Sequence, residues 1–253
     1  MMQLSVLGCS AGIGGARRTT SLLLDEDILI DAGSGVGDLS LDEMARVDHV
    51  FLTHSHLDHS GFLPLLADAA AFLRSSPLLV YALDETLSAL KQHMFNGVLW
   101  PDYTVKPSID EPYVRFVRVM HGVPIMLGNR RIVPLPVCHS VPTAGYCIDS
   151  GKASFAFSAD TTYCEAFWDA LGEIENLRYL MVEVTLRNAD TSIASGHMSA
   201  GLLAKGLNRL KKDVGLYITH LEPGKEESVM EEVYGVCGSF SPVRMMQGQR
   251  FIF

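Results

Sequence analysis

Residues 53–61, THSHLDHSG, place three histidines and an aspartate within six positions, directly after the apolar run VFL. Imidazole and carboxylate groups suit zinc and related transition ions, so a chance surface cluster is the less favoured explanation. After a buried strand, His54 and His56 would point to the same side of the chain. Asp58 and His59 follow on the next turn, displaced enough to serve a second ion. The motif therefore predicts a metal site at the end of a strand.

Further residues of ligand type stand at predicted strand ends downstream. His139 follows RRIVPLPVC, Asp160 ends ASFAFSA, and His220 ends VGLYIT. The carboxyl ends of strands in α/β proteins bring side chains to one shared edge of a sheet. The candidate metal ligands are therefore His54, His56, Asp58, His59, His139, Asp160 and His220.

The order of predicted elements indicates an α/β fold. SLLL and ILI flank an acidic turn as a hairpin, and helix-like and strand-like runs alternate after them. We expect one helix over HSGFLPLLADAAAFLRSS, and RFVRVM opens a second half that repeats the theme. Two sheets packed face to face with helices outside are predicted. No linker or low-complexity stretch divides the chain, so residues 1–253 are expected to form a single domain.

The composition restricts the cellular compartments and the binding partners that are compatible with the sequence. No apolar run approaches the roughly 18 residues that cross a bilayer, and the N-terminal segment resembles a strand and turn more than a signal peptide. The five cysteines include no C-x-x-C pair, which argues against a disulfide framework and a thiolate zinc site and favours a cytoplasmic location. A net charge of −9 makes a long nucleic acid an unfavourable partner, whereas a small anion stays compatible.

HSHLDH, with His139, the SADT around Asp160 and the ITH at His220, resembles the metallo-β-lactamase superfamily over nearly the whole chain. The resemblance implies a four-layer αβ/βα sandwich with two divalent metal ions. Zinc is the first expectation, with Mn²⁺ or Fe²⁺ as alternatives. His54, His56 and His139 would hold one ion, Asp58, His59 and His220 the other, and Asp160 would bridge them. Asp31, in LIDAGSG, would support the site without being a ligand.

His197, in GHMSAGLLAKGL, lies 23 residues before His220. This arrangement is similar to that of phosphodiesterases of the superfamily, both the tRNA 3′-end endonuclease RNase Z and the class II cyclic-nucleotide phosphodiesterases. The resemblance implies that Glu183 orients His197 and that His197 protonates the leaving alkoxide. Our mechanistic hypothesis adds that Asp58 orients the attacking water. Alternatively, His197 is only a residue at a helix N-terminus, with Ser199 as the cap.

Residues 93–104, HMFNGVLWPDYT, resemble a stretch of the class II cyclic-nucleotide phosphodiesterases. Phe95, Trp100 and Tyr103 would form a wall on which a base stacks, or would belong to the core and a dimer contact. Ser60 departs from the aliphatic residue that the signature of this class has after HSHLDH.

The leading hypothesis is a dinuclear phosphodiesterase that converts a 3′,5′-cyclic nucleotide, or another small anionic phosphodiester, to a 5′-nucleotide. An RNase Z-like endonuclease is the alternative, although no basic Gly/Pro-rich arm for tRNA is found. A thioester or lactone hydrolase would not need His197, and a non-catalytic metal-binding protein is the remaining hypothesis. The resemblance also implies a homodimer. SAGIGGARR lacks the G-K-[ST] ending of a phosphate loop and is expected to be a turn near the site.

Overall fold

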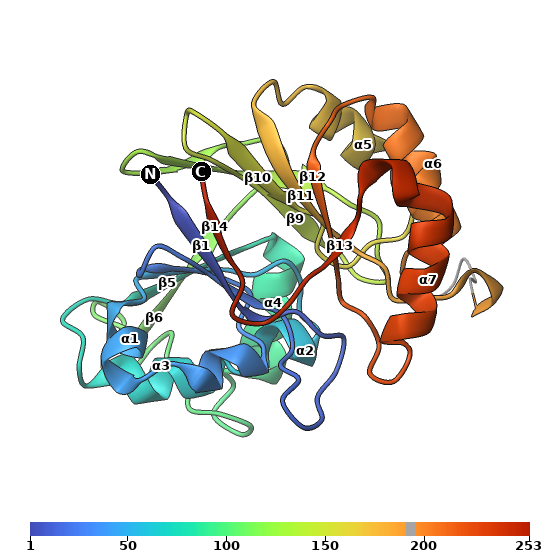
Figure 1. Cartoon of the computed structure of the whole chain (residues 1–253). Coiled ribbons are helices and arrows are strands. Elements are labelled where there is room, and N and C mark those ends of the chain that lie inside the picture. The colour runs from blue at the N-terminus through green and yellow to red at the C-terminus, as the bar shows by residue number, and fades with distance from the viewer. Residues whose placement is uncertain (191–195) are drawn as a thin grey trace.

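The computed structural model describes residues 1–190 and 196–253. Within these residues the strands form two seven-stranded sheets that face each other, with helices on the outer sides (Figure 1). The first sheet has, in spatial order, β14 (Arg250–Ile252), β1 (Gln3–Gly8), β2 (Ser21–Leu24), β3 (Ile28–Ile30), β4 (His49–Phe51), β5 (Leu78–Ala82) and β6 (Val114–Arg118). The second has β13 (Val243–Arg244), β12 (Gly215–Thr219), β11 (Leu177–Glu183), β10 (Ser154–Phe157), β9 (Ala144–Asp149), β8 (Arg130–Pro136) and β7 (Ile125–Leu127). The expected αβ/βα sandwich is confirmed.

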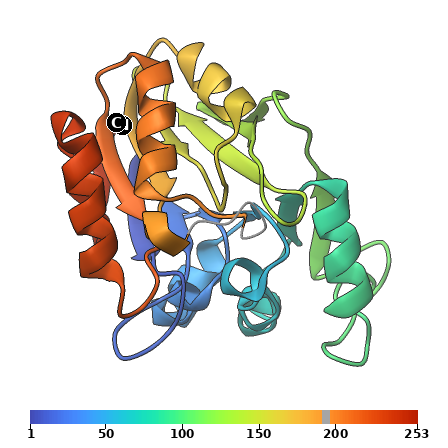
Figure 2. The ribbon, with the colours of Figure 1, turned by 90° about the vertical axis from the view of Figure 1, so that its right-hand side faces the viewer.

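The helices cover the outer face of each sheet. The helices of the first half are α1 (Leu41–Arg46), α2 (Leu57–Ser60), α3 (Leu63–Ala71) and α4 (Asp84–His93). The helices of the second half are α5 (Glu165–Gly172), α6 (Ala200–Leu210) and α7 (Glu226–Cys237). Figure 2 shows α5–α7, coloured yellow to red, over the second sheet, and the blue and cyan helices under the first.

Apolar side chains fill the space between the sheets and the two spaces beneath the helices. β1 alternates partly buried and buried residues, because only one of its faces is covered by the second sheet. β10 is buried at every position, since the other sheet covers one face and helices cover the other. Phe51 and Tyr146, from opposite sheets, meet edge to face with ring centroids 5.6 Å apart. The packing holds the carboxyl ends of the central strands at one common edge.

Two sequence predictions about this frame were wrong. The single helix expected over residues 59–76 is divided, because Phe62 N–H donates to Ala32 O and Ala32 N–H donates to His59 O, so the backbone bonds across the chain at this point. The segment RFVRVM does not open the second half: β6 pairs parallel with β5 and ends the first sheet. The elements after β12, namely α7, β13 and β14, lay beyond the predicted pattern. Among the described residues, no helix has the length and apolarity to cross a membrane.

Candidate metal centre

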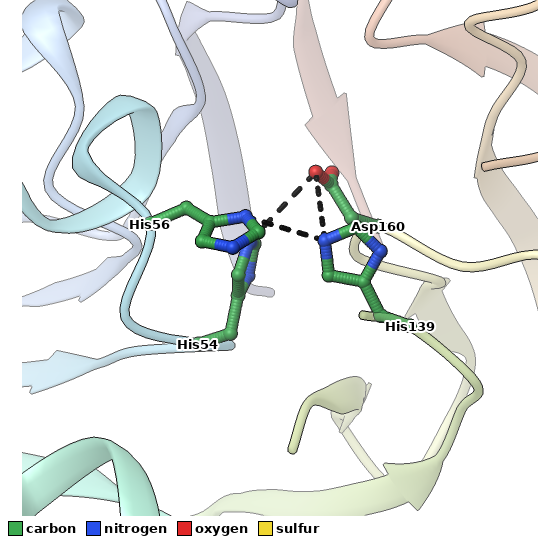
Figure 3. A group of neighbouring side chains, drawn as sticks. All are labelled: His54, His56, His139 and Asp160. Carbon is green, nitrogen blue, oxygen red and sulfur yellow. Dashed lines mark hydrogen bonds and ion pairs between the residues drawn. The ribbon is translucent and has the colours of Figure 1, made fainter. Parts of the chain in front are cut away.

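Four residues at the meeting edge of the sheets form a first donor set: His54, His56, His139 and Asp160 (Figure 3). One potential ligand atom from each lies within 4.8 Å of those of the others. His139 Nε2 is 3.3 Å from His56 Nδ1, and His54 Nε2 is 3.8 Å from Asp160 Oδ2. Loops from opposite sheets therefore present their donors to one small volume.

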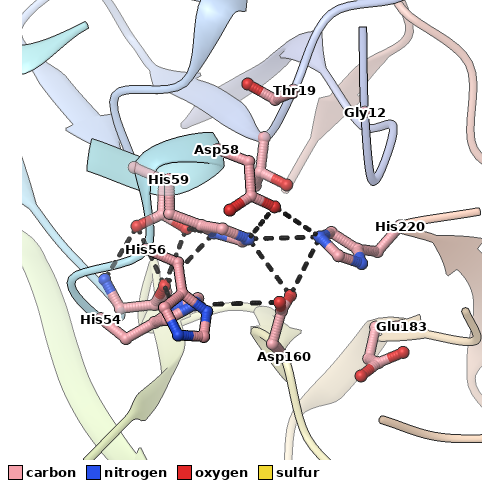
Figure 4. Close-up of polar contacts among 12 residues, drawn as sticks. Gly12, Thr19, His54, His56, Asp58, His59, Asp160, Glu183 and His220 are labelled. Carbon is pink, nitrogen blue, oxygen red and sulfur yellow. Dashed lines mark hydrogen bonds and ion pairs between the residues drawn. The ribbon is translucent and has the colours of Figure 1, made fainter. Parts of the chain in front are cut away.

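A second donor set lies beside the first and shares Asp160 with it. It consists of Asp58, His59, Asp160 and His220 (Figure 4). Asp160 Oδ1 is 3.2 Å from His59 Nε2 and 3.3 Å from His220 Nε2. Asp58 Oδ2 lies 3.1 Å from His220 Nε2. The two sets together bring all the ligand-type residues singled out in the sequence to one place, with Asp160 between them.

Asp31 anchors the first half of the site from a fully buried position. His59 Nδ1 donates a hydrogen bond to Asp31 Oδ2 over 2.7 Å, and Thr53 N–H donates to Asp31 Oδ1 over 2.8 Å. Thr53 Oγ1, which also bonds Asp31, is 2.9 Å from His54 Nδ1. Asp31 thereby holds His59 directly and His54 through one hydroxyl, in agreement with the supporting position implied by the resemblance.

Glu183 anchors the second half and is also fully buried. His197 Nδ1 donates to Glu183 Oε1 over 2.8 Å, which is the contact expected from the sequence. Thr161 N–H donates to the same oxygen over 2.9 Å, and the Thr185 hydroxyl donates to Oε2 over 2.8 Å. The Thr185 oxygen is in turn 2.9 Å from His220 Nδ1. One carboxylate therefore links His197 to the ligand loops around it.

The sequence analysis missed Thr185 and Gly196. Thr185 stands two residues after Glu183, and this period of two, which puts side chains on the same face of a strand, was an available signal. Gly196 O accepts a hydrogen bond from His139 Nδ1 over 2.9 Å. Gly196 has φ +71°, and a Cβ there would come within 2.9 Å of His139 Nδ1. Only glycine fits this position without displacing the imidazole.

The orientation of the imidazoles fits a bound cation. In their neutral forms His59 and His220 would each use Nδ1 as a donor, toward Asp31 and Thr185 respectively, and each Nε2 atom would then carry a lone pair. These two Nε2 atoms lie 3.3 Å apart and cannot hydrogen-bond each other in that state. His54 Nε2 and Asp160 Oδ1 are buried and have no hydrogen-bond partner among the described residues. A divalent cation satisfies such converging acceptors, and ligating histidines commonly have this outer hydrogen bond.

The pKa shifts of Asp160 and His54 agree with that fit. Burial alone would raise the pKa of Asp160, but His220, His59 and His54 surround this carboxyl and hold its pKa well below the ordinary value. Burial, reinforced by the neighbouring His59, lowers the pKa of His54 well below its usual range. A carboxylate and a neutral imidazole, the forms that coordinate metals, are therefore favoured at these positions.

His197 lies between the two donor sets. Its ring centroid is 4.9 Å from that of His139 and 5.5 Å from that of His220, nearly parallel to the latter. Burial disfavours the charged imidazole, but the hydrogen bond and the charge of Glu183 prevail and raise the pKa of His197 to about 9. Glu183 thus favours the protonated form of His197. Ser199, the residue before α6, makes no side-chain cap bond, so the capping role given to it in the alternative interpretation is not observed.

Left-handed backbone conformations cluster at the site. Asp31, Ala159 and His220 have φ values of 62°, 56° and 57°. Non-glycine residues adopt this region at an energetic cost and keep it where surrounding contacts impose it. For His220 those contacts include its N–H, which donates to Cys9 O over 2.9 Å, and its carbonyl oxygen, which lies 2.9 Å from Thr185 Oγ1.

The glycine-rich segment after β1 forms a turn beside the second donor set. Cys9 O accepts the backbone N–H of His220, and Gly12 lies near His220 at the rim (Figure 4). Ala11 N–H donates to Leu221 O over 3.2 Å. The expected turn near the site is therefore observed.

The aromatic stretch after α4 belongs chiefly to the core. Phe95 has no exposed surface, Tyr103 is 7% exposed, and both pack among the apolar residues beneath the first sheet. Trp100 is partly buried against the same cluster. The core interpretation therefore applies to Phe95 and Tyr103, and a wall for a base is not formed by them.

Comparison with known proteins agrees with this geometry. Residues 26–221 match the Beta-lactamase superfamily domain. A probable 3′,5′-cyclic-nucleotide phosphodiesterase of Yersinia pestis is 25% identical over 208 residues, which cover 72% of this chain and 59% of that protein. A ribonuclease Z of Methanococcus maripaludis is 30% identical over 156 residues, 57% of this chain and 48% of that protein. The crystal structure of unliganded yeast PDE1 superposes with a TM-score of 0.82 at 16% identity, covering 100% of this chain and 99% of the other.

The chain belongs to the beta-lactamase superfamily. Fold, family and the paired His/Asp donor sets together support a metal-dependent hydrolase. The chain spans about half of the length of the curated relatives, 59% of the Yersinia protein and 48% of the ribonuclease Z.

Proposed function

We propose that the chain is a dinuclear-metal phosphodiesterase acting on a small anionic phosphodiester, foremost a 3′,5′-cyclic nucleotide that it opens to a 5′-nucleotide. The observation that carries the proposal is the His197–Glu183 pair, 2.8 Å apart, set beside two donor sets that share one aspartate. A hydrolase that expels a good leaving group has no need of such a proton donor, whereas an alkoxide leaving group requires one.

Each donor set would hold one divalent ion, with zinc as the first candidate and Mn²⁺ or Fe²⁺ as alternatives. His54, His56 and His139 would hold one ion, Asp58, His59 and His220 the other, and Asp160 both. When bound, such a pair of ions activates a water molecule and stabilises charge on phosphoryl oxygens.

Three side chains of the chain would carry out the remaining catalytic roles. Asp58, whose side chain is 30% exposed, can accept a hydrogen bond from the attacking water and orient it. The protonated imidazole of His197 would donate its proton to the departing 3′ oxygen, and Glu183 would keep the ring in place through Nδ1. The buried carboxylate would also stabilise the charged imidazole before the proton is transferred.

The surroundings favour a small substrate. A pocket of about 660 Å³ adjoins His139, between the N-terminus of α4, the end of β6 and residues 137–143. This volume lies in the range of small-molecule sites, and of the candidate ligands His139 alone is among its lining residues. Arg17 and Arg18, next to the glycine-rich turn, are engaged in ion pairs with Glu226 and Asp38. With a net charge of −9, the chain offers little to a long polyanion.

The names of the relatives support the same class. The Yersinia protein is a probable cyclic-nucleotide phosphodiesterase, and the Methanococcus protein is a ribonuclease Z. The second name keeps an RNA 3′-end endonuclease as the alternative function, to be separated by assay.

The test is a substrate panel with metal-replete protein: cyclic AMP, cyclic GMP, bis(p-nitrophenyl) phosphate, a precursor tRNA and a thioester. We expect cleavage of the generic diester and of a cyclic nucleotide. His197→Ala should lower diester turnover by about 10²–10⁴-fold while the metal content stays unchanged. His93→Ala, at the exposed end of α4, is the matched control and should retain activity.

Cleavage of the thioester alone would overturn the phosphodiesterase proposal. Cleavage of precursor tRNA, with cyclic nucleotides untouched, would favour the endonuclease. Full diester activity in His197→Ala would remove this histidine from the mechanism.

A further inference from the structure

Two cysteines outside the donor sets are in direct contact. The sulfur atoms of Cys138 and Cys164 lie 2.6 Å apart, although the residues are 26 positions apart in the sequence. Both are free thiols in this structure. A disulfide bond is about 2.05 Å long, so bond formation would need a movement of only about half an ångström.

The two cysteines lie next to two candidate metal ligands. Cys138 immediately precedes His139, and Cys164, at the start of α5, follows Asp160 by four residues. Cys138 N–H donates to Thr161 Oγ1 over 3.0 Å, and Cys138 O accepts from Thr162 N–H over 2.8 Å. These hydrogen bonds hold the two loops side by side, with the two sulfur atoms in contact.

The two thiols differ in access. Cys138 is exposed and lines the pocket that also contains His139, whereas Cys164 is buried in the core beneath α5 and α6. A small oxidant can therefore reach one sulfur from solvent, and the second sulfur is already against it. An accessible thiol with a resolving thiol in contact is the arrangement of a reversible oxidation site.

We propose that Cys138 and Cys164 form a reversible disulfide that ties the His139 loop to the Asp160 loop, with a peroxide as the oxidant. The Cys138 sulfur attacks one peroxide oxygen, the O–O bond breaks, and the sulfur becomes a sulfenic acid while one water leaves. Cys164 then attacks that sulfur and displaces a second water. In sum, two thiols lose two hydrogen atoms, one S–S bond forms, and hydrogen peroxide is reduced to two molecules of water.

The cross-link would act on the site by restraining its loops. It closes a loop between residues 138 and 164 that contains both His139 and Asp160. Closing a loop of this length raises the stability of the fold, chiefly by restricting the unfolded chain. Where release of an ion requires these loops to separate, the bond also slows the release; this second effect rests on the proposed metal site.

The experiment treats the metal-replete protein with hydrogen peroxide, alkylates the remaining thiols and maps peptides without reduction. We expect one peptide pair joined through Cys138 and Cys164 and lighter by two hydrogen atoms, which dithiothreitol separates. The thermal midpoint should rise by roughly 5–10 °C on oxidation. Transfer of the ions to a chelator should slow on the order of tenfold.

Cys138→Ser, at an exposed position, should abolish the cross-link and the thermal shift, and the matched Cys9→Ser variant should keep both. Separate alkylation of Cys138 and Cys164 after peroxide treatment, or a rise in the midpoint that persists in Cys138→Ser, overturns the proposal. A cross-link with unchanged release of the ions overturns the coupling to the site. Peptide mapping and the thermal midpoint require no phosphodiesterase activity, so a failure of the proposed function would be distinguishable.

Discussion

The two halves of the molecule each contain one buried anchor carboxylate, and the two anchors are built differently. Asp31, in the first half, contacts residues of a single short segment, Thr53 and His59. Glu183, in the second half, contacts its own segment through Thr185 and two distant segments through Thr161 and His197. The first anchor therefore supports ligands that already lie together in the sequence. The second assembles groups that only the fold brings together.

The largest expected effect comes from Asp160, which joins the two halves. Asp160→Ala removes a donor from both sets and should abolish diester cleavage and the binding of at least one ion. Metal analysis by mass spectrometry and diester turnover measure the two losses. Unchanged metal content would contradict the shared role of Asp160.

The next largest effects are expected at the two anchor carboxylates, Asp31 and Glu183, and they should differ in kind. Asp31→Asn should weaken metal binding about 10–100-fold, because a neutral amide is a poorer partner for the N–H of a ligating imidazole. Glu183→Gln should lower diester turnover about 10–100-fold with a smaller loss of metal, because the charge that favours protonated His197 is removed. Metal affinity and turnover are measured on both variants. Identical profiles would show that the anchors do not differ in function.

A smaller effect is expected from the two threonines whose hydroxyls contact both an anchor carboxylate and a candidate ligand histidine. Thr53→Val and Thr185→Val keep the side-chain shape and delete the hydroxyls that contact His54 and His220. Each should weaken metal binding roughly tenfold. Thr185→Val should also lower turnover, since it disturbs Glu183, and competition with a chelating dye measures the affinities.

The smallest effect on the site is expected at Gly206 of α6. A Cβ there would overlap the indole of Trp168, so Gly206→Ala should lower the free energy of unfolding by about 1–3 kcal/mol. Metal content and turnover should stay at the wild-type level at 25 °C. Thermal denaturation checks the first expectation, and a parallel loss of metal would contradict the separation of this packing contact from the site.

The contrast between the anchors also explains what the sequence could predict. THSHLDHSG indicates its chemistry by local spacing, and His139, Asp160 and His220 follow apolar runs that end at strand ends. Gly196 was missed because its partner His139 is distant in sequence, and the contact of Thr185 with His220 likewise depends on the fold, although the spacing of Thr185 from Glu183 could have indicated it. β14 is similar: three residues, Arg250–Ile252, gain strand identity only by pairing with β1. The division of the expected helix at residues 60–62 depends likewise on Ala32.

The positions of the His59 and His220 imidazoles have a consequence for the thermal stability of the protein. With Nδ1 bonded to Asp31 and Thr185, the neutral rings would direct two Nε2 lone pairs at each other over 3.3 Å, an arrangement that a cation between them would stabilise. By mass action, a folded state that alone binds an ion gains about 2.7 kcal/mol when the free ion is at a hundredfold its dissociation constant. The free energy of unfolding should therefore increase with the concentration of free metal ion in the solution.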